Sequence, residues 1–100
     1  MLILLTNDDG YSALGINALF DCLKEEHEVI MFAPDRERSA VSNTLTLHEP
    51  LRVDKVGENR FKSSGSPADC VLLALHGGFL DRKPDVVISG INNGPNLGTD

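Results

Sequence analysis

Residues 2–10 read Leu2-Ile3-Leu4-Leu5-Thr6-Asn7-Asp8-Asp9-Gly10 and carry the strongest indication of the fold. A short apolar run that stops at a polar turn is typical of a parallel strand buried on both faces, so we expect a strand over residues 2–6. Asp8 and Asp9 follow that strand directly. Because buried carboxylates need a cation, hydrogen-bond donors or open water, the pair suggests a divalent metal at the mouth of an α/β sheet.

The next stretch completes one supersecondary unit. Apolar residues recur at helical spacing after the turn at residues 10–12, which predicts an amphipathic helix over residues 13–25. Residues 28–33 (EVIMFA) read as a second strand. Strand, helix and strand in this order form a right-handed βαβ unit, so the sequence belongs to the α/β class.

The second half continues the pattern with shorter elements. Residues 44–63 alternate weakly and suggest short strands with a turn at residues 57–59. Ser66-Pro67-Ala68-Asp69 predicts the start of a helix, because Ser66 can cap it, proline suits its first position and Asp69 stands where a capping box places its acid. We expect this helix to reach about His76 and to be followed by a buried strand over residues 85–89.

A loop rich in glycine and asparagine (residues 90–100) closes the sequence. A sheet of three main strands would keep an exposed hydrophobic edge, and this loop should lead to a further helix and strand. We therefore expect residues 1–100 to be the N-terminal part of a single α/β domain in a longer protein.

Composition excludes several classes of function. The chain has 100 residues, a hydrophobic fraction of 41% and a formal net charge of -6, without a block of Lys and Arg. Long nucleic acids are therefore not expected partners, although a small phosphate ester is compatible if a metal supplies positive charge. No signal peptide or membrane span is apparent, which favours a cytoplasmic location. Cys22 and Cys70 are expected to be two buried thiols rather than a disulfide.

Three polar loops should meet at the carboxyl ends of the strands, where open α/β sheets bind their ligands. The first strand delivers Asn7, Asp8 and Asp9, the second delivers residues 35–42, and the last delivers the asparagines of residues 92–96. Carboxylate, hydroxyl and amide oxygens are hard donors that suit Mg²⁺, Mn²⁺ or Ca²⁺. The histidines and cysteines have no zinc-ligand spacing.

Each of these segments also has a purely structural interpretation. Residues 7–10 could form a turn with a helix cap, and residues 35–38 could be a self-paired, solvated surface. The turn at residues 64–66 could hold a phosphate at a helix N-terminus, but an ordinary cap is the simpler interpretation. Residues 92–96 could be a loop without a role. The joint placement of the three loops at strand ends favours function.

Four segments together resemble the SurE family of survival-protein-E nucleotidases, in the order that the family shows and over the whole chain. The segments are Leu4-Leu5-Thr6-Asn7-Asp8-Asp9-Gly10, Ala33-Pro34-Asp35-Arg36-Glu37-Arg38-Ser39-Ala40, Ser64-Gly65-Ser66-Pro67-Ala68-Asp69-Cys70-Val71 and Val87-Ile88-Ser89-Gly90-Ile91-Asn92-Asn93-Gly94-Pro95-Asn96-Leu97-Gly98. Some family members carry Thr where Ser66 stands, a change that keeps the hydroxyl cap.

The resemblance implies a Rossmann-like, three-layer αβα fold with a mostly parallel sheet, incomplete here at its C-terminus. It implies a metal-dependent phosphatase acting on nucleoside 5′- and 3′-monophosphates, with some members also trimming short polyphosphate. The family's ligands to one divalent ion carry over onto Asp8, Asp9, Ser39 and Asn92. The family is also longer than this chain and assembles as homodimers or tetramers, through C-terminal elements that this sequence lacks.

Our hypothesis for the chemistry is phosphomonoester hydrolysis, with Asp8 and Asp9 as the catalytic carboxylates. Asn96 and backbone N–H groups near Ser39 and Ala40 would contact the substrate phosphate. Either an activated water or a carboxylate could attack, and Asp8 is our choice for the base or nucleophile.

Three alternatives stay open. The first is a non-catalytic metal- or nucleotide-binding module, and the second is an inactive fragment of the enzyme. The third, a flavodoxin-like or dinucleotide-binding domain, is disfavoured because the first turn has no G-x-G-x-x-G. The preferred base, the preference for a 5′ or 3′ phosphate, and the physiological metal do not follow from the sequence.

Overall fold

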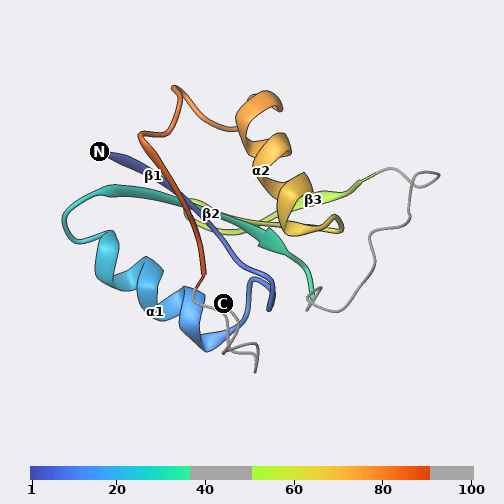
Figure 1. Cartoon of the computed structure of the whole chain (residues 1–100), viewed down its shortest axis with the longest axis horizontal. Coiled ribbons are helices and arrows are strands. Elements are labelled where there is room, and N and C mark those ends of the chain that lie inside the picture. The colour runs from blue at the N-terminus through green and yellow to red at the C-terminus, as the bar shows by residue number, and fades with distance from the viewer. Residues whose placement is uncertain (37–50, 91–100) are drawn as a thin grey trace, which may run out of the picture.

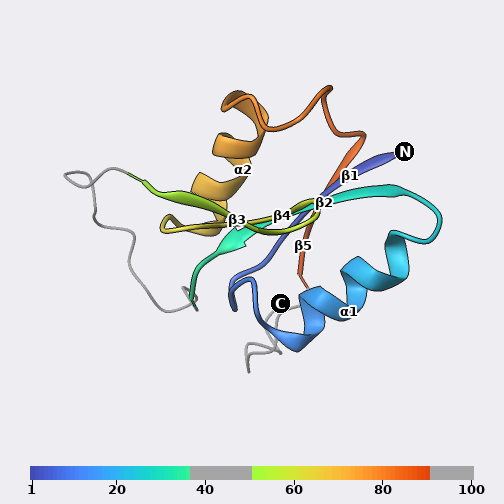
Figure 2. The ribbon, with the colours of Figure 1, turned by 180° about the vertical axis from the view of Figure 1, so that it is seen from behind.

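The computed structural model describes residues 1–36 and 51–90 of the chain. A sheet runs through the middle of the described part, with one helix on each of its two faces (Figures 1 and 2). The elements in chain order are β1 (Leu2–Thr6), α1 (Leu14–Leu23), β2 (Glu28–Pro34), β3 (Val53–Gly57), β4 (Arg60–Ser63), α2 (Pro67–His76) and β5 (Val86–Ser89). The expected three-layer αβα arrangement is confirmed.

The strands of the described part form one sheet in the order β3-β4-β2-β1-β5. All neighbouring pairs are parallel except β3 with β4, so the sheet is mostly parallel as expected. Numbered by chain position, the four mutually parallel strands lie in the order 3-2-1-4, with β1 between β2 and β5. This is the order of the first strands of a Rossmann fold.

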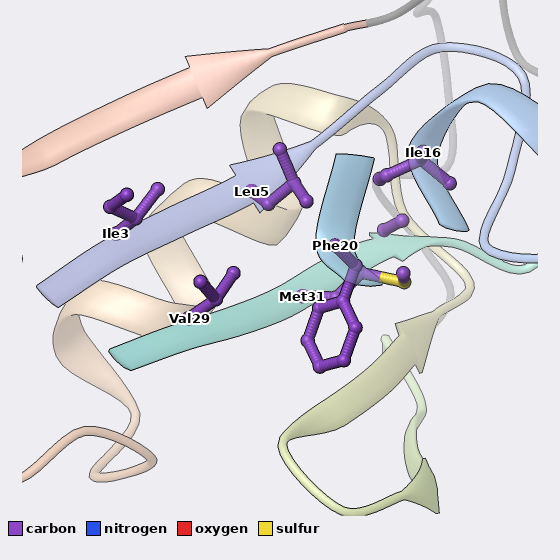
Figure 3. Packing of buried hydrophobic residues seen from close by; sticks show 7 residues of the cluster. Ile3, Leu5, Ile16, Phe20, Val29 and Met31 are labelled. Atoms are coloured by element: carbon purple, nitrogen blue, oxygen red, sulfur yellow. The ribbon is translucent and has the colours of Figure 1, made fainter. Parts of the chain in front are cut away.

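Two hydrophobic cores lie on opposite faces of the sheet because β1 is buried on both sides. Ile3 and Leu5 point toward α1, whereas Leu2 and Leu4 point toward α2, as the two-residue period of a strand requires. Figure 3 shows the first core, in which side chains from β1 and β2 pack against Ile16 and Phe20 of α1. The continuous apolar runs of the sequence therefore report the double burial of β1 and β2.

The core beneath α2 is built around three aromatic rings. The Phe32 ring stacks on Phe61 with centroids 5.4 Å apart and meets the Phe79 ring edge-on at 5.2 Å. Cys70 and Ala74 are the buried residues of α2 and rest on the same cluster. These rings attach β4 and the segment after α2 to the central strands.

Element boundaries differ from the sequence expectations by a few residues. The helix expected over residues 13–25 is shorter, because Lys24 and Glu25 are exposed and add nothing to the apolar face. The second strand extends one residue further than expected, to Pro34, which pairs with Ser63 of β4. The turn expected at residues 57–59 is confirmed by the left-handed backbone of Asn59 (φ 59°) between β3 and β4. The alternating residues 44–47 lie outside the described residues.

The expectation of two buried thiols is wrong for one of them. Cys70 is buried and Cys22 is exposed, and neither forms a disulfide. Cys22 lies two residues after the buried Phe20, about 200° further round the helix, so it faces solvent.

The strand expected over residues 85–89 is present as β5, but the expectation that it is buried is wrong, because Val86 is 38% and Val87 46% exposed. β5 is the edge strand of the described sheet, so its valines form the exposed hydrophobic edge that the sequence also predicts. Among the described residues, neither helix has the length and apolar character needed to cross a membrane.

Candidate functional site

The strand order reverses at the carboxyl ends of β1 and β5. β1 leads through α1 to β2 on one side, while β5 lies on its other side and is reached through α2 on the opposite face. In doubly wound sheets the ligand crevice lies at such a reversal, beyond the carboxyl ends of the strands. Thr6 and Ser89 are register partners there, and the Gly90 N–H donates to the Thr6 carbonyl oxygen over 2.8 Å. The loops that follow β1 and β5 therefore start side by side.

Asp8 and Asp9 occupy the two central positions of a tight turn directly after β1. The turn is closed by Asn7, whose Oδ1 accepts from the Gly10 N–H at 3.1 Å and whose Nδ2 donates to the Gly10 carbonyl oxygen at 3.0 Å. Asn7 is 0% exposed, whereas Asp8 and Asp9 are half-buried. The structure thus keeps two neighbouring carboxylates at the carboxyl edge of the sheet, within reach of solvent.

The same turn is attached to the end of β2. The Tyr11 N–H donates to the Pro34 carbonyl oxygen over 2.8 Å. Gly10 has φ +107°, and a Cβ at this position would lie 3.2 Å from the backbone carbonyl carbon of Arg36. Only glycine adopts this conformation without strain and lets the two backbones approach so closely. The loop after β2 therefore begins beside the acidic turn.

Interpreted as structure alone, residues 7–10 do form a turn, but they do not cap α1. The N-cap of α1 is Ala13, which makes no side-chain capping bond. Of the surface expected over residues 35–38, the structure describes Asp35 and Arg36, which pair with Arg36 Nε 3.7 Å from Asp35 Oδ1. The Arg36 side chain is 74% exposed but the Asp35 side chain only 21%, so only Arg36 is solvated as expected.

The N-terminus of α2 is an ordinary cap, as the simpler interpretation predicts. The Asp69 N–H donates to Ser66 Oγ, and the Ser66 N–H donates to Asp69 Oδ2, which completes the capping box. The Asp69 carboxylate already places negative charge at this helix end, which disfavours a bound phosphate. A Cβ on Gly65 would lie 2.6 Å from the Asp69 Cβ, so the preceding glycine leaves room for the box.

The remaining predicted site residues lie outside the described residues. Ser39 and Ala40 fall within residues 37–50, and Asn92 and Asn96 fall within residues 91–100. In residues 1–36 and 51–90, no group of three or more His, Cys, Asp and Glu side chains is placed to hold a metal ion. The described part therefore contributes two carboxylates, which are hard oxygen donors of the kind that Mg²⁺ and Mn²⁺ bind.

Sequence reasoning treated Asn7 as one more polar group of the loop and missed its contacts with Gly10. The signal was available, because asparagine three residues before glycine is typical of a turn in which the side chain binds the backbone. It also missed Lys62, whose Nζ lies 5.3 Å from the centroid of the Tyr11 ring. No local pattern pairs these two residues, which come together only when β4 joins the sheet.

Together, the strand order and the acidic turn at its reversal define a doubly wound α/β protein with a candidate cation site beyond β1. Residues 3–100 match the family described as Survival protein SurE. The chain belongs to the SurE family.

Its relatives give the same result over the full chain. It is 56% identical over 100 residues to the 5′-nucleotidase SurE of Geotalea daltonii and 53% identical over 100 residues to that of Vibrio cholerae. These matches cover 100% of this chain and 40% of each relative. The crystal structure of the SurE protein from Aquifex aeolicus superposes with a TM-score of 0.87 at 48% identity, covering 100% of this chain and 41% of that one. The chain thus spans about two fifths of the length of these relatives.

Proposed function

We propose that the full-length protein containing this chain is a metal-dependent phosphatase that hydrolyses nucleoside 5′-monophosphates. The observation that carries the proposal is the position of Asp8 and Asp9 at the reversal of strand order, where doubly wound sheets bind ligands. Relatives more than half identical over the whole chain are 5′-nucleotidases. Activity on 3′-monophosphates and on short polyphosphate belongs to the same proposal, because both offer the same terminal phosphate.

The proposed site for one divalent ion consists of Asp8, Asp9, Ser39 and Asn92. The short distance along the chain from described residues supports this set of ligands, since one residue spans at most about 3.6 Å. Ser39 follows Arg36 by three residues and Asn92 follows Gly90 by two, which limits their Cα atoms to about 11 Å and about 7 Å from those anchors. Two carboxylates, a hydroxyl and an amide oxygen suit Mg²⁺ or Mn²⁺, and Ca²⁺ is compatible.

In this proposal the bound ion supplies positive charge that offsets the charge of the phosphate. Asp8 and Asp9 hold the ion, and Asp8 is the candidate for the base or nucleophile. Asn96 and the backbone N–H groups near Ser39 and Ala40 orient the phosphate by hydrogen bonds. The net charge of -6 makes such local cation and N–H donors necessary for binding an anionic ester.

The other parts of the proposal concern the whole protein. Its partner is a small nucleotide rather than a long nucleic acid, and it acts in the cytoplasm. A homodimer or tetramer is also part of the proposal, as the resemblance to the SurE family implies.

Phosphate release from AMP and GMP by the full-length protein, measured after chelation and after addition of Mn²⁺, tests the proposed function. We expect release only when Mn²⁺ is present. Parallel reactions with 3′-AMP and tripolyphosphate separate the substrate classes. Mn²⁺ binding without release from any substrate would contradict the enzyme and favour a non-catalytic binding module. Release that persists in excess chelator would contradict metal dependence.

A further inference from the structure

We propose that Asn7 is a positioning residue, whose buried amide fixes the directions in which the carboxylates of Asp8 and Asp9 leave the turn. The inference rests on the proposed function, since it assigns Asn7 a role toward the ion that the two carboxylates would hold. Asn7 differs in this from the other polar residues at the carboxyl edge of the sheet, because it would orient the two carboxylates and would not bind the ion itself.

The contacts of Asn7 support this role. Its Oδ1 and Nδ2 form a pair of hydrogen bonds with the N–H and C=O of Gly10, at 3.1 and 3.0 Å. The side chain is 0% exposed and both bonds are buried. Because the side chain is fully buried and both its oxygen and its nitrogen are held by Gly10, Asn7 is placed to shape the turn rather than to bind the ion itself. Its amide instead closes the ring of backbone that carries the two carboxylates.

Backbone hydrogen bonds anchor the turn at both of its ends. The Asn7 contacts hold the residues between those two anchors. The Thr6 carbonyl oxygen accepts from the Gly90 N–H before the turn, and the Tyr11 N–H donates to the Pro34 carbonyl oxygen after it. Between these anchors, adjacent carboxylates repel each other and favour conformations in which they diverge. A rigid pair of bonds across the turn would oppose that divergence and direct both carboxylates toward one ion.

Few side chains could replace Asn7. Aspartate would lose the donor and add a third negative charge in a buried position, whereas serine could accept from the Gly10 N–H but not donate to its carbonyl at the same distance. Alanine would leave the buried Gly10 N–H without its Asn7 acceptor, and it would leave the Gly10 carbonyl oxygen with the Ala13 N–H at 3.2 Å as its remaining partner. The series Asn, Ser, Ala therefore removes the contacts stepwise.

The experiment compares Mn²⁺ binding by calorimetry in full-length wild type, Asn7→Ser and Asn7→Ala, with Asn17→Ala as the matched control. Asn17 is also an asparagine whose Nδ2 binds nearby backbone, at Tyr11 O (2.9 Å) and Ala13 O (2.8 Å), but it lies beyond the acidic turn. Melting temperature is recorded for every variant without metal.

We expect the Mn²⁺ dissociation constant to rise about 10- to 100-fold in Asn7→Ala, as is typical when a residue that orients metal ligands is removed. Asn7→Ser should show a smaller rise, and it replaces the alanine variant if that one does not fold. Asn17→Ala should have a lower melting temperature than wild type but the same affinity for Mn²⁺. Nucleotide turnover should fall in parallel with affinity in the Asn7 variants.

Two results would overturn the inference while leaving the proposed function intact: unchanged Mn²⁺ affinity in the Asn7 variants, or an equal loss in Asn17→Ala. A wild-type protein that binds no Mn²⁺ would overturn the proposed metal site and this inference together. Binding that is Asn7-dependent without phosphatase activity would support the positioning role and contradict only the enzyme.

Discussion

The backbone N–H of Gly90 donates to the carbonyl oxygen of Thr6 over 2.8 Å. This bond joins the end of β5 to the end of β1. Thr6 and Ser89 pair in the sheet although their positions in the sequence differ by 83. Asp8 lies two residues beyond the bond, so the acidic turn stands at the reversal of the strand order. The local sequence forms the acidic turn after β1, and the topology of the sheet brings the end of β5 beside it.

Replacing Asp9 by asparagine should abolish Mn²⁺ binding and nucleotide turnover together in the full-length protein. The change keeps the size of the side chain but removes one of the two negative charges that the proposed site offers to a hard cation. Calorimetry with Mn²⁺ and phosphate release from AMP measure the two losses. Asp81→Asn is the control, because Asp81 is an exposed carboxylate in the segment between α2 and β5. Normal metal-dependent activity in Asp9→Asn would show that the site assignment is wrong.

Gly10→Ala should destabilise the fold by about 1–3 kcal/mol through backbone strain. Its φ of +107° disfavours a side chain, and the new Cβ would meet the Arg36 backbone at 3.2 Å. Gly78→Ala isolates the effect of strain, since Gly78 has φ +84° with nothing within 4 Å of its Cβ position. Urea unfolding should therefore find the larger loss at Gly10. Equal losses at the two positions would mean that the contact with Arg36 has no energetic consequence.

Ser66→Ala should cost about 1 kcal/mol of stability, because the Asp69 N–H loses its acceptor at the start of α2. Ser66→Thr should stay near wild type, since it keeps the hydroxyl. Thermal unfolding of both variants measures this difference, and KM for AMP is recorded alongside. A raised KM in Ser66→Ala without loss of stability would favour a phosphate site at this helix end over an ordinary cap.

Phe32→Ala should destabilise the protein by about 3–5 kcal/mol, the range for removing a buried phenylalanine. Phe32 is fully buried and its ring contacts both Phe61 and Phe79. Phe32→Leu should cost less because it leaves a smaller cavity. Guanidinium unfolding provides the comparison. If the two variants were equally stable, the aromatic contacts beneath α2 would not hold β4 and the segment after α2 in place.

The elements that sequence reasoning predicts well are those determined by local chemistry. The apolar run of residues 2–6 predicts β1 because a short strand buried on both faces places all of these side chains in the core. The capping box at Ser66 and Asp69 gives the start of α2, since its reciprocal bonds need only residues three apart. Cys22 is a local feature that was misjudged, although helical periodicity places it opposite the buried face.

The rest depends on contacts between distant segments. Nothing in the sequence of β5 indicates on which side of β1 it will pair, yet that choice creates the reversal beside Asp8 and Asp9. The contact of Gly10 with Arg36 and the position of Lys62 above Tyr11 arise in the same way. The role of Asn7 falls between the two cases, because its spacing from Gly10 is local but its complete burial is not.

The most direct test of the central claim is the anomalous signal of Mn²⁺ in crystals of the full-length protein soaked with the metal. The claim predicts a single strong peak within about 2.6 Å of carboxylate oxygens of Asp8 and Asp9, the upper range for hard cations and oxygen ligands. The peak should vanish in Asp9→Asn crystals. A bound Mn²⁺ elsewhere, with none between these two carboxylates, would contradict the claim.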